Sequence, residues 1–282
     1  MSSTTLIVLA LVGLASGFVD AVAGGGGLLT VPALVLAGLD PVAAVATNKL
    51  AGVFGTGSAT LAFARAGKIE ANMAPAALAA CIGGALGALA LPYAPRAILS
   101  LALPFVLIAV ALYFVLSPNL GEGQRRQRVS PVVYVSAFAP AIGFYDGAFG
   151  PGAGSFYLIA LVALVGFSLI PAMAAGRLSN FGSNVGSLFV YALAGHIVAP
   201  AGLAMGVGAF VGARLGAASA IKAGAKLVRP LIITVSCAMA LKLMTAPGGL
   251  LASGRTKAHA GRGPNYPVPP KHRADLYLWL RR

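Results

Sequence analysis

The chain has 282 residues, of which 59% are hydrophobic and only 9% are charged. A soluble globular domain carries about 25% charged residues, so this composition excludes an ordinary soluble protein. The formal net charge is +14, but seven of the twenty Lys and Arg residues follow residue 250. The basic excess therefore does not indicate nucleic-acid binding, and we expect an all-α polytopic membrane protein.

Apolar runs of about 20 residues, the length that crosses a bilayer as a helix, recur along the chain. They predict about eight spanning helices, over residues 5–23, 42–64, 73–92, 97–117, 131–149, 172–194, 198–220 and 228–246. The first run lacks the basic start and the cleavage site of a signal peptide, so we expect it to be a retained spanning helix.

Two further apolar pieces, residues 28–39 and 155–169, are too short to cross alone, and each follows a glycine-rich stretch. Glycine costs about 1 kcal/mol and proline about 3 kcal/mol in a helix interior, so these stretches predict helix breaks at membrane depth. Backbone freed there must be buried in protein or line a polar cavity. The glycines expected to form the breaks are Gly24, Gly25, Gly26, Gly150 and Gly152.

The surroundings of the two breaks are similar in sequence, which predicts an internal duplication of about 120 residues. Residues 17–24 match residues 143–150, and residues 49–69 match residues 177–197. Four crossings in each half would make the repeats parallel, and five would make them inverted. The expected organisation is a first repeat over 1–118, a basic connecting loop over 119–130, a second repeat over 131–249 and a basic, disordered tail over 250–282.

Two of the six acidic residues, Asp20 and Asp146, occupy matched positions directly before the breaks. An ionised carboxylate in a spanning segment costs about 2.5–3.5 kcal/mol, so it marks a polar cavity or a relay. Each Asp either caps the following half-helix by accepting its free amides, or takes a direct part in substrate or proton handling. The two roles are compatible.

Two cations, Lys49 and Arg177, are also matched and also lie in apolar surroundings. In one interpretation, each cation snorkels to the membrane interface or pairs with the Asp of its own repeat. In the other, the two cations and the helix N-termini at the breaks together attract an anion. Asn180, Ser183, Asn184 and Ser187 are spaced three and four residues apart, on one helical stripe that either lines a pathway or packs against a neighbouring helix.

The sequence offers no arrangement typical of catalysis. The glycine stretches lack the strand and the Gly-Lys-Ser/Thr context of nucleotide-binding loops. His196, His259 and His272 are isolated, without metal-ligand spacing, and no nucleophile and base can be matched. We therefore expect no enzyme activity, no metal and no cofactor.

These motifs together resemble the sulfite exporter TauE/SafE family of bacterial membrane proteins, and within it the YfcA-like branch. The resemblance rests on residues 17–27, 46–50, 143–152 and 176–184, in this order, and covers about residues 5–246. It implies a multi-pass permease of the inner membrane for small anions, with sulfite and organosulfur compounds as the family's substrates. The tail after residue 250 falls outside the resemblance.

We therefore expect a secondary transporter that moves a small sulfur-containing or carboxylate anion across the lipid bilayer by alternating access. Asp20 and Asp146, with the glycines, would cap the breaks, and protons are the candidate coupling ion. An anion channel and a non-transporting membrane scaffold are the alternatives. The residues expected to bind the anion are Thr47, Asn48, Lys49, Arg177, Asn180, Ser183 and Asn184.

Overall fold

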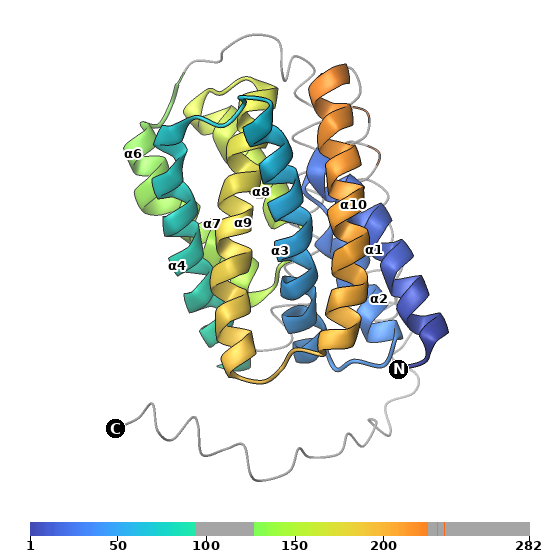
Figure 1. The fold of residues 1–282 in the computed structure, drawn as a ribbon. Helices are drawn as coiled ribbons and strands as arrows, with labels where there is room; N and C mark the ends of the chain where they lie inside the picture. Colours follow the sequence, from blue (N-terminus) through green and yellow to red (C-terminus); the bar gives the residue numbers. More distant parts are fainter. Residues whose placement is uncertain (94–126, 225–229, 231–233, 235–282) are drawn as a thin grey trace, which may run out of the picture.

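The computed structural model describes residues 1–93, 127–224, 230 and 234, and over these residues the chain is helical, without any strand (Figure 1). The all-α fold class is therefore confirmed. The longer elements are α1 (Ser3–Ala23), α2 (Gly27–Leu36), α3 (Pro41–Arg65), α4 (Ala74–Ala90), α7 (Ala139–Ala148), α8 (Ala153–Ala160), α9 (Leu169–Leu193) and α10 (Ala199–Ala223). The short elements are η1 (Ala71–Met73), η2 (Leu91–Tyr93), α6 (Pro131–Val133) and two π-helical turns, η3 (Tyr134–Phe138) and η4 (Leu161–Val165).

The observed helices agree with the predicted spans to within a few residues. Asp40 starts α3 because its side chain accepts hydrogen bonds from the amides of Val42 and Ala43, each at 3.1 Å, and Pro41 occupies the first helical position. The segment predicted at 131–149 is formed by α6, η3 and α7 in succession. The predicted span at 97–117, nearly all of that at 228–246, most of the connecting loop and the tail lie outside the described residues.

Both predicted helix breaks are confirmed. Helix α1 ends at Gly24, which has a φ of 84°, and α2 begins three residues later. Helix α7 ends just before Gly150, which has a φ of 90°, and α8 begins at Ala153. Side chains other than glycine rarely adopt such positive φ values, so these glycines allow the chain to leave one helix and start the next in a new direction.

Close contacts between glycines and residues of neighbouring helices show the directions in which the helices run. Gly208 of α10 packs against Ala10 of α1, and Gly212 packs against Leu14, so α1 and α10 run parallel. In the same way α3 runs parallel to α10, α9 and α7 run parallel to α4, and α3 runs antiparallel to α9. The contacts between α3 and α10 are Leu50–Gly202 and Phe54–Gly206, and those between α9 and α4 are Gly182–Ala77 and Gly186–Cys81. The contacts between α7 and α4 are Gly143–Ala80 and Gly147–Gly84, and those between α3 and α9 are Gly52–Asn184 and Gly57–Phe181.

Helices that the predicted duplication would match therefore run in opposite directions. Helices α1, α3 and α10 run one way, and α4, α7 and α9 run the other way. The pairs α1 and α7, α3 and α9, and α4 and α10 are thus inverted, which is the arrangement that the sequence left as one of two alternatives. The duplication itself stays a prediction.

The outer and inner helices differ in polarity. Among the described residues, three segments are long and apolar enough to cross a membrane: Ser3–Ala23, Ala74–Tyr93 and Ala199–Ala223. They carry exposed rows of large apolar side chains, such as Leu78, Ile82 and Leu86 on α4, where a bilayer would lie. Helices α3 and α9 are as long as α10 but carry most of the buried polar residues, which protein contacts rather than lipid must satisfy.

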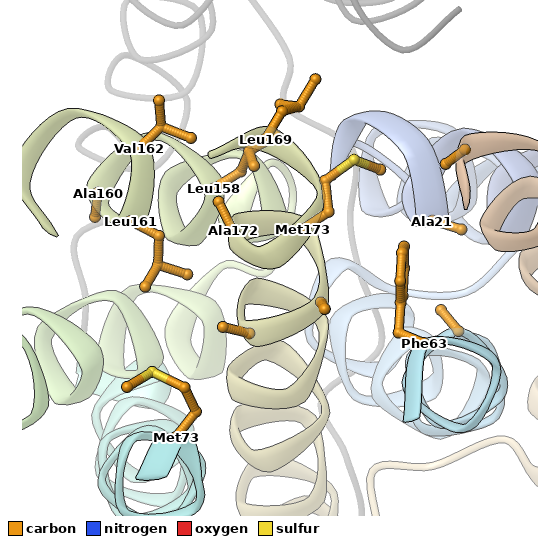
Figure 2. Packing of buried hydrophobic residues seen from close by; sticks show 14 of the residues in the cluster. Ala21, Phe63, Met73, Leu158, Ala160, Leu161, Val162, Leu169, Ala172 and Met173 are labelled. Carbon is orange, nitrogen blue, oxygen red and sulfur yellow. The ribbon is translucent and has the colours of Figure 1, made fainter. Parts of the chain in front are cut away.

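A cluster of buried hydrophobic residues packs beside the helix breaks (Figure 2). It joins Ala21 of α1, Phe63 of α3, Leu158 of α8 and Met173 of α9, all fully buried. Because side chains from four helices pack together there, the cluster holds the ends of α1 and α8 against the two long inner helices.

Candidate functional site

The two helix breaks lie against each other. A Cβ atom at Gly24 would collide with the backbone of Gly154 and Ser155, so only glycine allows this approach. The hydroxyl of Ser155 donates a hydrogen bond of 2.6 Å to the carbonyl oxygen of Ala23. A Cβ atom at Gly27, the first residue of α2, would lie 3.0 Å from Pro151, so the N-terminal ends of α2 and α8 also lie close together.

Asp20, in the last turn of α1, connects the first break with α9. Its Oδ1 atom accepts a hydrogen bond from the amide of Gly26 at 3.1 Å, and its Oδ2 atom lies 3.1 Å from Nη1 of Arg177. The Arg177 side chain is fully buried, whereas that of Asp20 is 15% exposed. The Nε and Nη2 atoms of Arg177 have no hydrogen-bond partner among the described residues.

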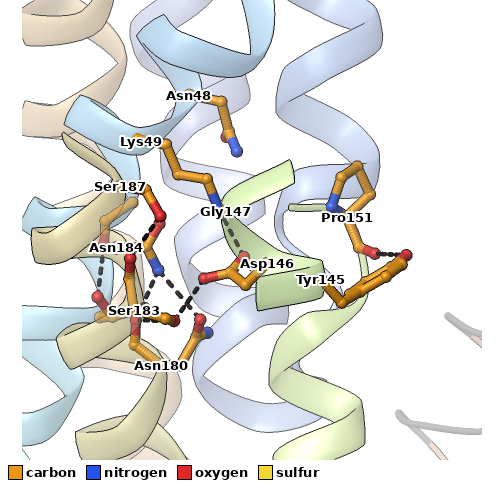
Figure 3. Close-up of polar contacts among 12 residues, drawn as sticks. Asn48, Lys49, Tyr145, Asp146, Gly147, Pro151, Asn180, Ser183, Asn184 and Ser187 are labelled. Atoms are coloured by element: carbon orange, nitrogen blue, oxygen red, sulfur yellow. Dashed lines mark hydrogen bonds and ion pairs between the residues drawn. The ribbon is translucent and has the colours of Figure 1, made fainter. Parts of the chain in front are cut away.

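Asp146, on α7, forms a tighter contact with two other helices (Figure 3). Lys49 of α3 donates from Nζ to Asp146 Oδ1 at 2.6 Å, and Ser183 of α9 donates from Oγ to Asp146 Oδ2 at 2.5 Å. The side chains of Lys49 and Asp146 are 0% and 3% exposed. Both carboxylate oxygens are thus held by buried side chains.

Each ion pair joins one half of the chain to the other, which corrects two of the sequence-based interpretations. Neither cation pairs with the Asp of its own half, because Asp20 meets Arg177 and Asp146 meets Lys49. Neither cation snorkels to an interface, since both side chains are fully buried. The Gly26 amide bonds to Asp20 as the capping role requires, whereas the carboxylate oxygens of Asp146 accept from Lys49 and Ser183.

A small, partly open pocket with a volume of about 40 Å³ lies where the breaks meet. Both Asp20 and Asp146 line it, whereas Lys49 and Arg177 are not among its lining residues. Backbone from both breaks contributes to the wall, so the pocket combines carboxylates, side-chain amides and helix N-termini. The other lining residues are Ser16, Gly17, Gly24, Gly26, Gly27, Thr30, Asn48, Ala51, Gly52, Gly55, Thr56, Gly150, Gly154, Asn180, Asn184 and Ala209.

Thr47, Asn48 and Lys49 point to three different places. Asn48 lines the pocket, Lys49 reaches Asp146, and Thr47 accepts a hydrogen bond of 3.0 Å from the amide of Val198, which precedes α10. Successive residues of an α-helix are rotated by about 100°, so three neighbours cannot share one site. The structure thus separates Thr47 from the other predicted site residues.

The stripe of polar residues on α9 both lines the pocket and packs against a helix. Asn180 and Asn184 line the pocket, and Nδ2 of Asn184 donates to Oδ1 of Asn180 at 3.0 Å. Ser187 lies farther along, where a Cβ atom at Gly84 of α4 would approach its Oγ to 2.9 Å. Both interpretations of the stripe therefore apply, at different positions.

Two pocket residues, Ser16 and Thr30, were missed by the sequence analysis. The Ser16 hydroxyl donates to the carbonyl oxygen of Gly26 at 2.9 Å, and the Thr30 hydroxyl donates to Oδ1 of Asn48 at 2.5 Å. Ser16 lies four residues before Asp20 and hence on the same helix face, a signal that would have found it. Within the described ranges, no three His, Cys, Asp or Glu residues come close enough to hold a metal ion.

The chain is similar to known proteins over most of its length. The model of the sulfite exporter TauE/SafE family matches residues 9–243. The chain belongs to this family. The match includes both helix breaks and all four residues of the ion pairs. No solved structure matches the TauE/SafE chain.

Bacterial relatives of this TauE/SafE chain are named as membrane transporters. A probable membrane transporter protein, ORF9, from Sinorhizobium sp is 46% identical over 233 residues, which are 82% of this chain and 89% of that protein. The probable membrane transporter protein YfcA of Escherichia coli K12 is 42% identical over 86% of this chain and 91% of its own length. A probable membrane transporter protein of Haemophilus influenzae is 39% identical over 86% of this chain and 96% of its own length. The chain is accordingly a membrane transporter.

Proposed function

We propose that this TauE/SafE chain is a secondary transporter of a small anion, such as sulfite or an organosulfur or carboxylate compound. It would cross the inner membrane several times and work by alternating access. The observation that carries the proposal is the polar pocket between two broken helices whose parent helices run in opposite directions. Secondary transporters commonly bind their substrate at such breaks, between inverted halves.

The pocket offers several groups that favour an anion. The N-terminal ends of α2 and α8 carry partial positive charge and adjoin it, because Gly26, Gly27 and Gly154 line the wall. Asn48 and Asn180 carry amide groups that can donate hydrogen bonds, whereas the amide group of Asn184 already donates to Asn180. Lys49 and Arg177 would act through their charge, while Thr47 and Ser183 would hold the surrounding helices in place.

The charges of the site support coupling to protons. Asp20, Asp146, Lys49 and Arg177 together have a formal charge of zero, and the two carboxylates, not the cations, line the pocket. A bare carboxylate beside the pocket repels an incoming anion. Protonation of one carboxylate removes this repulsion and leaves the site with a net charge of +1, so anion and proton would bind together.

Flux in proteoliposomes that contain the purified protein tests the transport class. We expect saturable uptake of sulfite, accelerated by sulfite loaded on the opposite side, as a carrier that alternates between two states requires. A non-saturating conductance would instead identify an anion channel, and the absence of flux for sulfite, methanesulfonate and acetate would favour a membrane scaffold. Either of these results contradicts the proposal.

Substitution of a pocket amide tests the site. Asn184→Ala removes one polar group, worth about 1–1.5 kcal/mol, so the KM for sulfite should rise about tenfold while the protein stays folded. Asn72→Ala is the matched control, because Asn72 is exposed beside Glu70 on η1, outside the pocket. An unchanged KM for Asn184→Ala would place the anion elsewhere.

A further inference from the structure

The two ion pairs resemble each other in sequence position but differ in their surroundings. We infer that Asp20 and Arg177 form the exchangeable pair, in which a proton on Asp20 releases the Arg177 guanidinium to bind the transported oxyanion. The pair of Asp146 and Lys49 stays closed and clamps the halves together. This inference deepens the proposed anion transport and rests on it.

The ion pair of Asp146 and Lys49 has a short N–O distance and is deeply buried. Its Nζ–Oδ1 distance is 2.6 Å, and the second oxygen of Asp146 accepts from Ser183 at 2.5 Å, so charge-assisted bonds satisfy both oxygens. The two side chains are 0% and 3% exposed, less than the 15% of Asp20, although Asp146 also lines the pocket. The three residues come from α3, α7 and α9, so breaking this contact would loosen three helices at once.

The pair of Asp20 and Arg177 is longer and more open. Its Nη1–Oδ2 distance is 3.1 Å, and the Asp20 side chain is 15% exposed at the pocket wall. Within the described part of the chain, the second Asp20 oxygen accepts only from the amide of Gly26. Gly154 lines the pocket and lies directly against the guanidinium, since a Cβ atom at Gly154 would come within 2.6 Å of Nη1. A larger residue at this position would force the guanidinium to move.

Arg177 also has donors that its present partner does not use. Its Nε and Nη2 atoms are buried and have no partner among the described residues. These two atoms lie on the same side of a guanidinium and present parallel N–H groups, which match two oxygens of one carboxylate, sulfite or sulfonate group. Buried donors without acceptors cost free energy, so an oxyanion that pairs with these donors of Arg177 recovers that cost.

The charged groups around Asp20 come from several packed helices. Arg177 of α9 pairs with it directly, and Lys49 of α3 and Asp146 of α7 interact with it electrostatically. Helix α2 carries no titratable side chain, and α8 contributes only the hydroxyl of Tyr157. On α10 the two cations, Arg214 and Lys222, are exposed. One proton on Asp20 therefore changes this group from neutral to +1, which gives one proton for each monovalent anion.

Anion-induced thermal stabilisation of the full-length protein in detergent tests the inference. The probes are methanesulfonate and acetate, which keep their charge between pH 6 and pH 8. Because binding takes up one proton, the affinity of the unsubstituted protein should fall by up to about tenfold for each pH unit above neutrality. Asp20→Asn mimics the protonated state, so its affinity should be independent of pH and at least equal to that of the unsubstituted protein at pH 6.

Three further variants separate the roles of the pairs. Arg177→Lys retains the charge but loses the two parallel donors, so its affinity should fall about tenfold or more. Asp146→Asn should lower the unfolding temperature while any binding keeps its pH dependence; if this variant does not fold, Asp20→Asn and Arg177→Lys decide the question. Lys68→Gln, an exposed cation in the loop after α3, is the control and should behave like the unsubstituted protein.

The outcomes distinguish the inference from the proposed function. Binding by Asp20→Asn that keeps the pH dependence of the unsubstituted protein contradicts the inference, as does loss of the pH dependence in Asp146→Asn alone. In both cases anion transport itself would stand. If the unsubstituted protein is stabilised by neither probe and carries no sulfite flux, both the proposed function and the inference are wrong.

Discussion

Removal of Lys49 should destabilise the protein strongly, because it leaves the buried carboxylate of Asp146 without its cationic partner. The Lys49 and Asp146 charges lie 2.6 Å apart, and at an effective dielectric constant of 20 they attract by about 6 kcal/mol. Part of this energy offsets the cost of taking both charges out of water, and loss of one partner of a buried pair costs about 3–5 kcal/mol. We expect this loss for Lys49→Met.

The double variant Lys49→Met with Asp146→Asn should recover most of the lost stability. It removes both charges, and the new amide oxygen can still accept the hydrogen bond from Ser183. Stability is measured by thermal and SDS unfolding in detergent, with Lys68→Met as a control that should change it by less than about 0.5 kcal/mol. If the double variant is as unstable as Lys49→Met, the loss does not come from an unpaired charge, and the reasoning is refuted.

Two further predictions concern packing and hydrogen bonding, and both are measured by thermal unfolding. Gly147→Ala should cost about 1–3 kcal/mol, because its Cβ atom would collide with the carbonyl oxygen of Gly84 on α4. Gly176→Ala is the matched helical control, since its nearest contact would be an ordinary 3.5 Å, and it should not destabilise; equal losses would contradict the packing argument. Thr47→Val removes the acceptor for the amide of Val198 and should cost about 1–3 kcal/mol, whereas Thr47→Ser should be nearly neutral. Equal stability of the two Thr47 variants would show that this hydrogen bond contributes little.

Much of the helical framework was predictable because its causes are local. Long apolar runs, the Asp40-Pro41 start of α3 and the glycines at positions 24 and 150 each act through neighbouring residues. The acidic and amide residues of the pocket could also be found, because Asp20, Asp146, Asn48 and Asn184 are conspicuous in an apolar chain. A polar or charged side chain in a spanning segment costs free energy, so it stands out in the sequence and marks a candidate functional residue.

The assignment of partners was not predictable, because it depends on contacts between residues that are far apart in the chain. The sequence left pairing of each cation with the Asp of its own half as one alternative, but Arg177 meets Asp20, 157 residues away, and Lys49 meets Asp146, 97 residues away. The position of Thr47 was missed for another reason. Adjacent residues in a sequence motif face different sides of a helix, and only the packed neighbours decide which side is the pocket.

The sequence by itself thus determined the membrane class, the two helix breaks and the set of polar residues beside them. Apolar runs, helix-breaking glycines and isolated charged residues each affect the structure within a few residues of their position, so they can be identified from the sequence. Only the tertiary structure decided that α1 and α7 run in opposite directions, that the ion pairs cross between the halves, and that Asp20 is more exposed at the pocket than Asp146. These properties arise when separate helices bury one another's side chains, and no single segment contains the information about its neighbours.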